Sequence, residues 1–195
     1  VSTLPFPDFD YSKIDTFFFS VQKCFGLPAG LGVWVVNDRC VKKAAELDAK
    51  GNQSGPHHSI SALLDQEKNN QTPATPNTLE IFMLSKVCEA MNGKGIDEVR
   101  AETVEKATLL EEFIEHSTNF GFAVKNEAHR SKTVIVATTS KSPKAINKYL
   151  ASHEMEIGGG YGSEKTTQVR IANFPATSID QMKRLIELLK DEDAY

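Results

Sequence analysis

The chain has 195 residues, of which 40% are hydrophobic and 25% charged, and its net charge is -4. This length suffices for one domain with a good core or for parts of two. Because the charge is weakly acidic and no run of about 18 apolar residues occurs, we expect neither a nucleic-acid partner nor a membrane partner.

The first predicted elements flank a lysine. Residues 17–21 predict a short buried strand, residues 26–30 a tight loop, and residues 31–36 a second strand. Lys23 therefore lies just past a strand end, beside a turn, where open α/β sheets bind ligands. A lysine in such an apolar run is either exposed at an edge or kept there for chemistry, since desolvation favours the neutral amine.

Helices and strands alternate through the rest of the chain, which predicts a compact α/β layer. Asp38 caps a first helix over residues 38–50. The later elements are helices over residues 79–91, 96–118, 143–152 and 179–189, and strands over residues 133–138 and 169–174. The charged side chains of the helix over residues 96–118, Lys106 among them, are interpreted as a solvated face.

A polar segment over residues 51–76 interrupts this alternation. It is rich in Asn, Gln, Ser, Thr and Pro and contains a brief apolar island at residues 60–64. Loops of this length are usually functional or disordered. His57 and His58 lie in it, either as solvated loop residues or, at His58, as a side chain that lines a substrate entrance.

The residues around Lys23 resemble a known family. Ser20-Val21-Gln22-Lys23 followed by Pro28-Ala29-Gly30-Leu31 is similar to the cofactor-lysine segment of the class V aminotransferases, and within them of the phosphoserine aminotransferases. These are fold-type I enzymes that use pyridoxal phosphate. The resemblance implies that Lys23 forms the Schiff base with the cofactor and acts as general base and acid, and that Gln22 contacts the cofactor phosphate.

The resemblance also implies which fold the chain has and which part of the longer enzyme it covers. In the family, an aspartate in a pattern like Asp-x-x-Ser-Ser pairs with the pyridine nitrogen of the cofactor. Ser2 and Thr3 match the end of that pattern, which places the aspartate before residue 1. We therefore expect the C-terminal part of a longer α/β enzyme. Residues 1–92 would end the large pyridoxal-phosphate-binding domain, and residues 93–195 would form the small C-terminal domain.

The segment Thr75-Pro76-Asn77-Thr78 predicts an N-terminal cap for the helix that follows, and this local role alone would explain it. The resemblance implies a second role. A Thr-Pro-x-Thr segment in phosphoserine aminotransferases reaches across a dimer interface to the cofactor phosphate of the partner subunit. Thr75 is thus a candidate cofactor-binding residue, and the resemblance implies a homodimer, although Ala74 replaces an asparagine of the family.

Arg170 interrupts an apolar strand, and an arginine there needs a carboxylate or phosphate partner. An edge strand with a nearby acid would supply one. The resemblance implies instead that Arg170 makes a two-pronged bond to the substrate α-carboxylate. A His-Arg pair that helps bind the substrate phosphate in the family is absent, since residues 163–165 read Ser-Glu-Lys.

Other chemistries are less well supported. Cys24, Cys40 and Cys88 are odd in number and widely spaced, so we expect a reduced, cytoplasmic protein. They and the histidines give no metal-ligand spacing, and we expect no metal. The glycine-rich residues 158–167 are not a phosphate-binding P-loop, because Glu164 stands where the motif requires glycine.

These observations lead to one preferred function and two alternatives. We expect pyridoxal-phosphate-dependent transamination between an amino acid and a 2-oxo acid, with phosphoserine and 2-oxoglutarate of serine biosynthesis as one such pair. Another class V activity, of the serine or alanine–glyoxylate or pyruvate type, is the first alternative. A non-catalytic fragment or binding module is the second, because the aspartate and the glycine-rich phosphate turn of the family are not among these residues.

Overall fold

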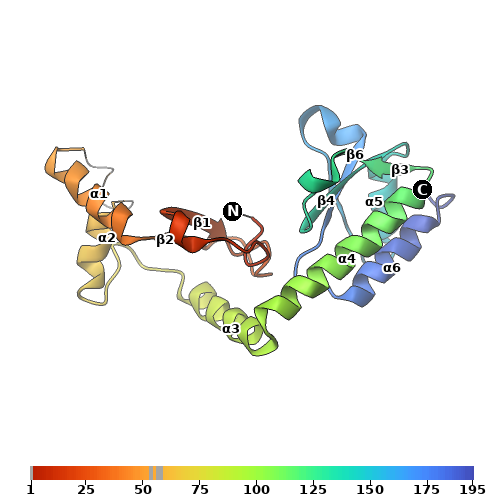
Figure 1. Cartoon of the computed structure of the whole chain (residues 1–195). Helices are drawn as coiled ribbons and strands as arrows, with labels where there is room; N and C mark the ends of the chain where they lie inside the picture. Colours follow the sequence, from red (N-terminus) through yellow and green to blue (C-terminus); the bar gives the residue numbers. More distant parts are fainter. Residues whose placement is uncertain (1, 53–54, 56–58) are drawn as a thin grey trace. The chain divides into compact units, whose positions relative to one another are not determined.

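The computed structural model describes residues 2–52, 55 and 59–195, which fall into two compact units (Figure 1). The first unit comprises Val1–Lys23 and Leu27–Glu89, and the second comprises Cys24–Gly26 and Ala90–Tyr195. The chain therefore leaves the first unit directly after Lys23 and returns to it at Leu27. The structure does not describe His57 and His58, so the prediction for His58 lies outside the described residues.

Among its described residues, the first unit contains two strands, two whole helices and most of a third, whose residues from Ala90 onward belong to the second unit. They are β1 (Thr16–Ser20), β2 (Gly32–Val36), α1 (Asp38–Ala49), α2 (Ile60–Glu67) and α3 (Thr78–Lys94), preceded by the short 3-10 helix η1 (Tyr11–Lys13). The strands pair antiparallel, with Phe18 opposite Trp34. The prediction that residues 17–21 form a buried strand is wrong, since Phe18 is 69% exposed, and Trp34 on the second strand is 46% exposed. Two strands alone cannot bury both faces of a sheet.

Two local details of this unit differ from the sequence prediction. Asn37 caps α1 in place of Asp38, because the Asn37 Oδ1 accepts a hydrogen bond from the Cys40 amide at 3.1 Å. The polar segment is not loop throughout. Its apolar island forms α2, whose first turn Ser59 caps by accepting a hydrogen bond from the Ala62 amide. The surrounding polar residues concealed this helix, which has only eight residues.

The second unit is a four-stranded antiparallel sheet with three helices. The strands lie in the order β3-β4-β6-β5, with β3 at Phe120–Phe122, β4 at Val134–Thr139, β5 at Gly158–Gly159 and β6 at Gln168–Ala172. The helices are α4 (Ile96–His116), α5 (Pro143–Ala151) and α6 (Ile179–Lys190), and α4 and α6 run side by side (Figure 1). The short 3-10 helices η2 (Glu127–His129) and η3 (Gly162–Thr166) complete the unit.

Apolar side chains from all three helices and from the sheet meet in one core. The core includes Leu110, Ile114, Ile135, Ala137, Ile146, Leu150, Val169, Ile171, Met182, Ile186 and Leu189. The helical predictions over residues 96–118 and 179–189 are confirmed to within two residues at each end. The architecture is mixed α/β, as expected. Among the helices of the described residues, none is both long and apolar enough to cross a membrane.

One charged residue contradicts the expectation of a solvated face. Lys106 on α4 is only 1% exposed. Its Nζ donates hydrogen bonds to the carbonyl oxygens of Phe174 at 2.9 Å and Thr177 at 2.6 Å. These acceptors lie about seventy positions further along the chain, so helical periodicity could not reveal them.

Candidate active site

Lys23 and Gln22 lie in the loop that joins β1 to β2. Backbone hydrogen bonds close this loop around the fully buried Val21, whose amide donates to the Leu31 carbonyl and whose carbonyl accepts from the Leu27 amide, both at 3.3 Å. Gln22 and Lys23 are half-buried. Within the described part of the chain, the Lys23 amine has no hydrogen-bond or ion-pair partner, so it remains available to a ligand.

The amide of Gln22 supports a ligand at this place. Its Oε1 is buried and has no hydrogen-bond partner among the described residues. Buried polar atoms are almost always paired, so an orphaned one beside a partnerless amine indicates a site that a polar ligand completes. An amine that can condense with an aldehyde and an amide whose Nε2 can donate to a phosphate fit pyridoxal phosphate chemically.

An acidic residue that no sequence motif indicated lies near this loop. Glu80, in the first turn of α3, is only 7% exposed, and its Oε2 is buried without a partner among the described residues. A Cβ added to Gly30 would lie 2.8 Å from the Glu80 Oε1, so that position of the loop requires glycine. The available signal was a carboxylate two residues after Thr78, where a helix start favours negative charge.

Thr75 lies on an exposed segment before α3. Asn77 caps the helix instead, because its Oδ1 accepts a hydrogen bond from the Glu80 amide at 3.2 Å. The Thr75 hydroxyl has no hydrogen-bond partner within the described residues. The local role of the segment therefore belongs to Asn77 and leaves the Thr75 side chain without a role among the described residues.

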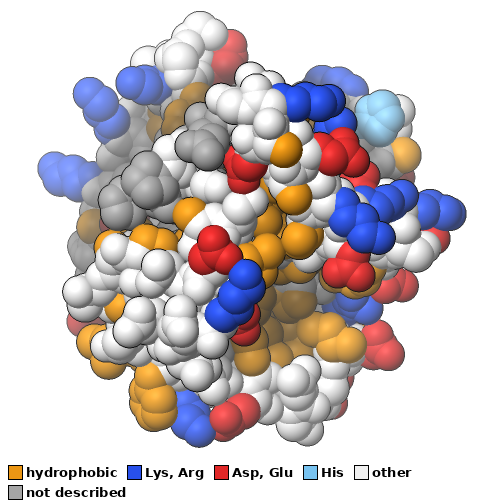
Figure 2. Space-filling view, turned by 90° about the vertical axis from the view of Figure 1, so that its left-hand side faces the viewer, with side chains coloured by type: hydrophobic (Ala, Val, Ile, Leu, Met, Phe, Trp, Pro, Cys, Tyr) orange, Lys and Arg blue, Asp and Glu red, His pale blue; other side chains and the backbone are white. Residues whose placement is uncertain are grey.

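Apolar side chains are exposed on the helix that follows Thr75. Leu79 is 66% exposed, Phe82 is 60% exposed and Ile81 is 47% exposed. Hydrophobic side chains also reach the surface in several places on the face drawn in Figure 2, with charged side chains beside them. An exposed cluster of large apolar side chains is typical of an interaction surface.

Arg170 lies on β6, which is an interior strand between β4 and β5. Its Nε donates a hydrogen bond to the Gly159 carbonyl at 2.6 Å, and the guanidinium covers the ring of Tyr161. A Cβ added to Gly158 would lie 3.2 Å from the Arg170 Nη2. No acidic side chain of the described residues pairs with Arg170, so the alternative of an edge-strand arginine beside an acid does not describe this structure.

The loop between β5 and β6 offers little positive charge. Glu164 accepts hydrogen bonds from the Thr167 hydroxyl at 2.9 Å and the Gln168 amide at 3.3 Å. Lys165 is exposed. A phosphate held at this loop would therefore meet one lysine and one carboxylate.

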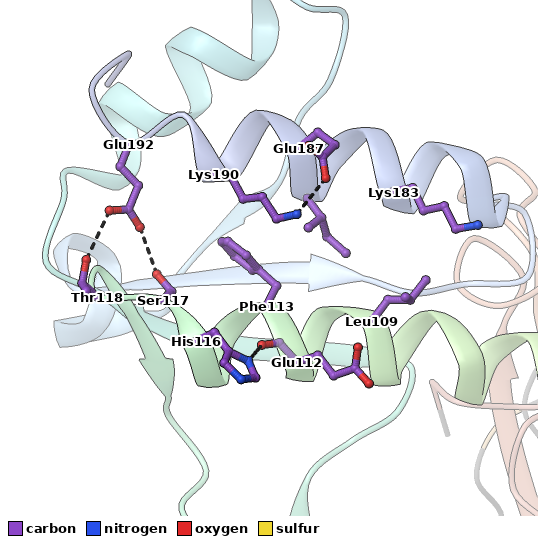
Figure 3. Close-up of a pocket in the computed structure, with 11 residues that line it drawn as sticks. Leu109, Glu112, Phe113, His116, Ser117, Thr118, Lys183, Glu187, Lys190 and Glu192 are labelled. Atoms are coloured by element: carbon purple, nitrogen blue, oxygen red, sulfur yellow. Dashed lines mark hydrogen bonds and ion pairs between the residues drawn. The ribbon is translucent and has the colours of Figure 1, made fainter.

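A separate groove of about 500 Å³ lies between α4 and α6. Figure 3 shows Leu109 and Phe113 within it and the ion pair between Glu187 and Lys190 at its rim. Its lining includes neither Lys23 nor Arg170. In the described part of the chain, no three His, Cys, Asp or Glu side chains gather closely enough to hold a metal ion.

Comparison with known families gives a match over most of the chain. The family model described as aminotransferase class V matches residues 6–177. A phosphoserine aminotransferase of Rhodococcus opacus is 25% identical over 176 residues, which cover 88% of this chain and 47% of that protein. A phosphoserine aminotransferase of Campylobacter jejuni is 26% identical over 93% of this chain and 49% of its own. This chain thus spans about half the length of the curated relatives it matches.

Solved structures give the same fold. A phosphoserine aminotransferase from Cytophaga hutchinsonii superposes with a TM-score of 0.95 and 50% sequence identity, over 98% of this chain and 53% of that one. An aspartate aminotransferase from Thermus thermophilus superposes with a TM-score of 0.83 and 17% identity, over all of this chain and 54% of that one. At 17% identity the likeness concerns the fold alone.

Proposed function

Because this chain belongs to the class V aminotransferase family, whose model matches residues 6–177, we propose that it carries a large part of an aminotransferase that uses pyridoxal phosphate. The reaction moves an amino group between an amino acid and a 2-oxo acid. The observation that carries the proposal is the Lys23 amine, partnerless among the described residues, beside the buried and unpaired Oε1 of Gln22.

Lys23 and Gln22 divide the work of holding the cofactor. Lys23 would hold pyridoxal phosphate covalently through its amine, and the Gln22 Nε2 would donate a hydrogen bond to the phosphate. The bound cofactor supplies the electron sink that stabilises negative charge at the substrate Cα. Lys23 would move the proton between the substrate Cα and the C4′ carbon of the cofactor, which is general base and acid catalysis by one side chain.

Arg170 binds the substrate α-carboxylate. The contact of its Nε with the Gly159 carbonyl and the stacking of its face on Tyr161 orient the guanidinium and leave its Nη groups for a ligand. A fixed fork of donors matches the two oxygens of a carboxylate. Since every amino donor and every oxo-acid acceptor carries this group, one arginine serves both halves of the reaction.

We infer a homodimer of cytoplasmic location in which Thr75 contacts the cofactor phosphate of the partner subunit. The exposed Leu79 and Phe82 lie directly after this segment and suit a two-fold contact. Residues 1–92 belong to the large domain in this proposal, and residues 93–195 form the small one.

The proposal also concerns which amino acid donates the amino group. The names of the Rhodococcus and Cytophaga relatives suggest phosphoserine, with 2-oxoglutarate as acceptor and serine biosynthesis as the setting. The residues near Arg170 favour an unphosphorylated substrate, because Ser163 and Glu164 stand where the His-Arg pair is expected. A serine or alanine–glyoxylate or pyruvate activity is therefore the second candidate.

Reduction with borohydride tests the proposal. The natural protein at its full length, mixed with pyridoxal phosphate, should give a visible absorbance band and a reduced adduct on the Lys23 peptide. Lys23→Ala should abolish both and stop turnover. Lys43→Ala is the matched control, because Lys43 is exposed and pairs with Glu46. Normal transamination by Lys23→Ala would refute the proposal.

The same measurement separates the non-catalytic alternative. That alternative is favoured by the length of the chain, which is about half that of its relatives. It predicts no adduct on these 195 residues alone. A stable yellow adduct that an amino acid reverses would count against it.

A further inference from the structure

The buried Lys106 fixes a single turn of the second unit. Its Nζ donates to the carbonyl oxygens of Phe174 and Thr177, which begin and end the turn between β6 and α6. The Thr177 amide also donates to the Phe174 carbonyl, at 2.9 Å. Burial of an ammonium is costly unless its N–H groups are satisfied, so this lysine is closely tied to these two acceptors.

A second buried polar residue fixes the same turn from the preceding position. Asn173 is fully buried, and its Nδ2 donates to the carbonyl oxygens of Thr103 and Lys132, both at 2.8 Å. Thr103 lies one helical turn before Lys106 on α4. The helix therefore holds the turn at two successive points, which restricts its movement against α4.

This turn meets the three residues that follow Lys23. Cys24–Gly26 belongs to the second unit, and Cys24 is only 1% exposed. Gly26 has a φ of +65°, and a Cβ added to it would lie 2.9 Å from the Cβ of Ala176. Ala176 lies between the two residues that Lys106 binds. The approach is so close that it requires glycine at position 26.

We propose that Lys106 is a positioning residue for Lys23. Lys106 fixes the turn over residues 174–177, and with it the place of Gly26. It thereby fixes the main chain directly after Lys23, which sets the position of the Lys23 amine. The same turn also follows the end of β6, the strand that carries Arg170. The inference rests on the proposed function, because it gives Lys106 a role only if Lys23 holds pyridoxal phosphate.

The geometry is typical of preorganisation. A group that reacts covalently must be held within a fraction of an ångström of its reactive position, by residues whose own positions are fixed by packing and hydrogen bonds. A misplacement of about 1 Å lowers reaction rates by about a hundredfold. A merely structural lysine would instead contribute to stability and leave the reaction of Lys23 unchanged.

The variant Lys106→Met distinguishes a positioning role of Lys106 from a merely structural one. Methionine fills the space of the lysine side chain without its charge or its hydrogen-bond donors. Lys141→Met is the matched control. Lys141 also donates to a backbone carbonyl of this unit, that of Glu192 at 3.0 Å, and its position is remote in sequence from the turn. Three quantities are measured for each variant. They are the rate of adduct formation between pyridoxal phosphate and Lys23, the pH at the midpoint of the titration of the adduct's visible absorbance band, and the melting temperature. The protein is used at its full natural length.

We expect both variants to melt earlier, but only Lys106→Met to slow adduct formation, by about tenfold to a hundredfold, and to move the pH midpoint. Equal adduct kinetics and pH midpoints in Lys106→Met and Lys141→Met would overturn the inference. Absence of an adduct in the unmodified protein would overturn the proposed function as well. The two failures are therefore distinguishable.

A second pair of variants decides the question if Lys106→Met does not fold. Gly26→Ala places a methyl group against Ala176, and Ala176→Gly removes the atom that it strikes. We expect Gly26→Ala to slow adduct formation and the double variant Gly26→Ala with Ala176→Gly to recover part of the rate. An unchanged rate in Gly26→Ala would overturn the inference, since the turn would then not position the segment after Lys23.

Discussion

The guanidinium carbon of Arg170 lies 3.8 Å from the centre of the Tyr161 ring. This stacking covers one face of the guanidinium, while the Nε is engaged with the Gly159 carbonyl. A cation held over an aromatic face is stabilised by the ring quadrupole. The arginine is thus oriented before any substrate arrives, and its Nη groups have no partner among the described residues.

Arg170→Ala should lower kcat/KM for the amino donor and the oxo-acid acceptor alike. The loss should correspond to about 2 to 5 kcal/mol, because a charged hydrogen-bonded pair loses one partner. Absorbance of bound pyridoxal phosphate should remain. Steady-state kinetics with both substrates checks this, with Arg184→Ala as a control, because the Arg184 guanidinium is exposed and donates to the His153 carbonyl. A loss confined to one substrate would contradict the assignment.

Gly158→Ala and its neighbour Gly159→Ala form a matched pair. A Cβ at Gly158 would lie 3.2 Å from the Arg170 Nη2, whereas a Cβ at Gly159 meets nothing within 4 Å. We expect only Gly158→Ala to raise KM for carboxylate substrates. The size should be about 0.5 to 1.5 kcal/mol, the cost of a side chain displaced from its preferred rotamer. Equal KM values in both variants would show that the orientation of Arg170 is unimportant.

The substrate should show little dependence on a phosphate group. Lys165 is the one basic residue of the segment over residues 158–167, and Glu164 repels phosphate there. We expect kcat/KM for phosphoserine to be close to that for serine or alanine. Competition between these donors measures the ratio directly. A preference for phosphoserine of about a hundredfold or more, the worth of one or two charged hydrogen bonds, would show that other residues supply the phosphate site.

Mixing two inactive variants tests the dimer. In a hybrid of a Lys23→Ala subunit with a Thr75→Ala subunit, one of the two sites regains both residues if Thr75 acts in the partner subunit. Random pairing should restore about a quarter of the wild-type sites. Thr75→Ser, which keeps the hydroxyl, is the control and should stay active alone. Sedimentation of a fully active monomer would contradict this arrangement.

Burial lowers the pKa of the Lys106 ammonium below its ordinary value of 10.5, and Lys94 acts in the same direction, while Glu102 and Cys24 oppose it. Between the lowered pKa and 10.5, the unfolded chain binds a proton that the folded chain lacks. The free energy of unfolding should therefore rise with pH through this window, relative to Lys106→Met. Denaturant titrations from neutral pH to pH 10.5 measure the difference. If the free energy of unfolding, relative to that of Lys106→Met, fell with pH in this window, the lowered pKa of Lys106 would be contradicted.

Local signals in the sequence were sufficient for most helices. The apolar spacing and flanking residues predicted α4 and α6 nearly to their ends, because a helix depends on contacts three and four residues apart. The lysine segment was likewise found from adjacent residues. Where polar residues surrounded a short apolar run, at α2, the same signals failed.

The sequence by itself therefore determined most of the helices, the family resemblance and the candidates Lys23 and Arg170, since each depends on neighbouring residues. Only the tertiary structure decided which side chains are buried and what they meet. Lys106 has the spacing of a solvated residue, and its acceptors lie 68 and 71 positions away. Glu80 is buried for the same reason, because a glycine fifty positions earlier approaches it. Such contacts depend on the path of the whole chain, which no local pattern encodes.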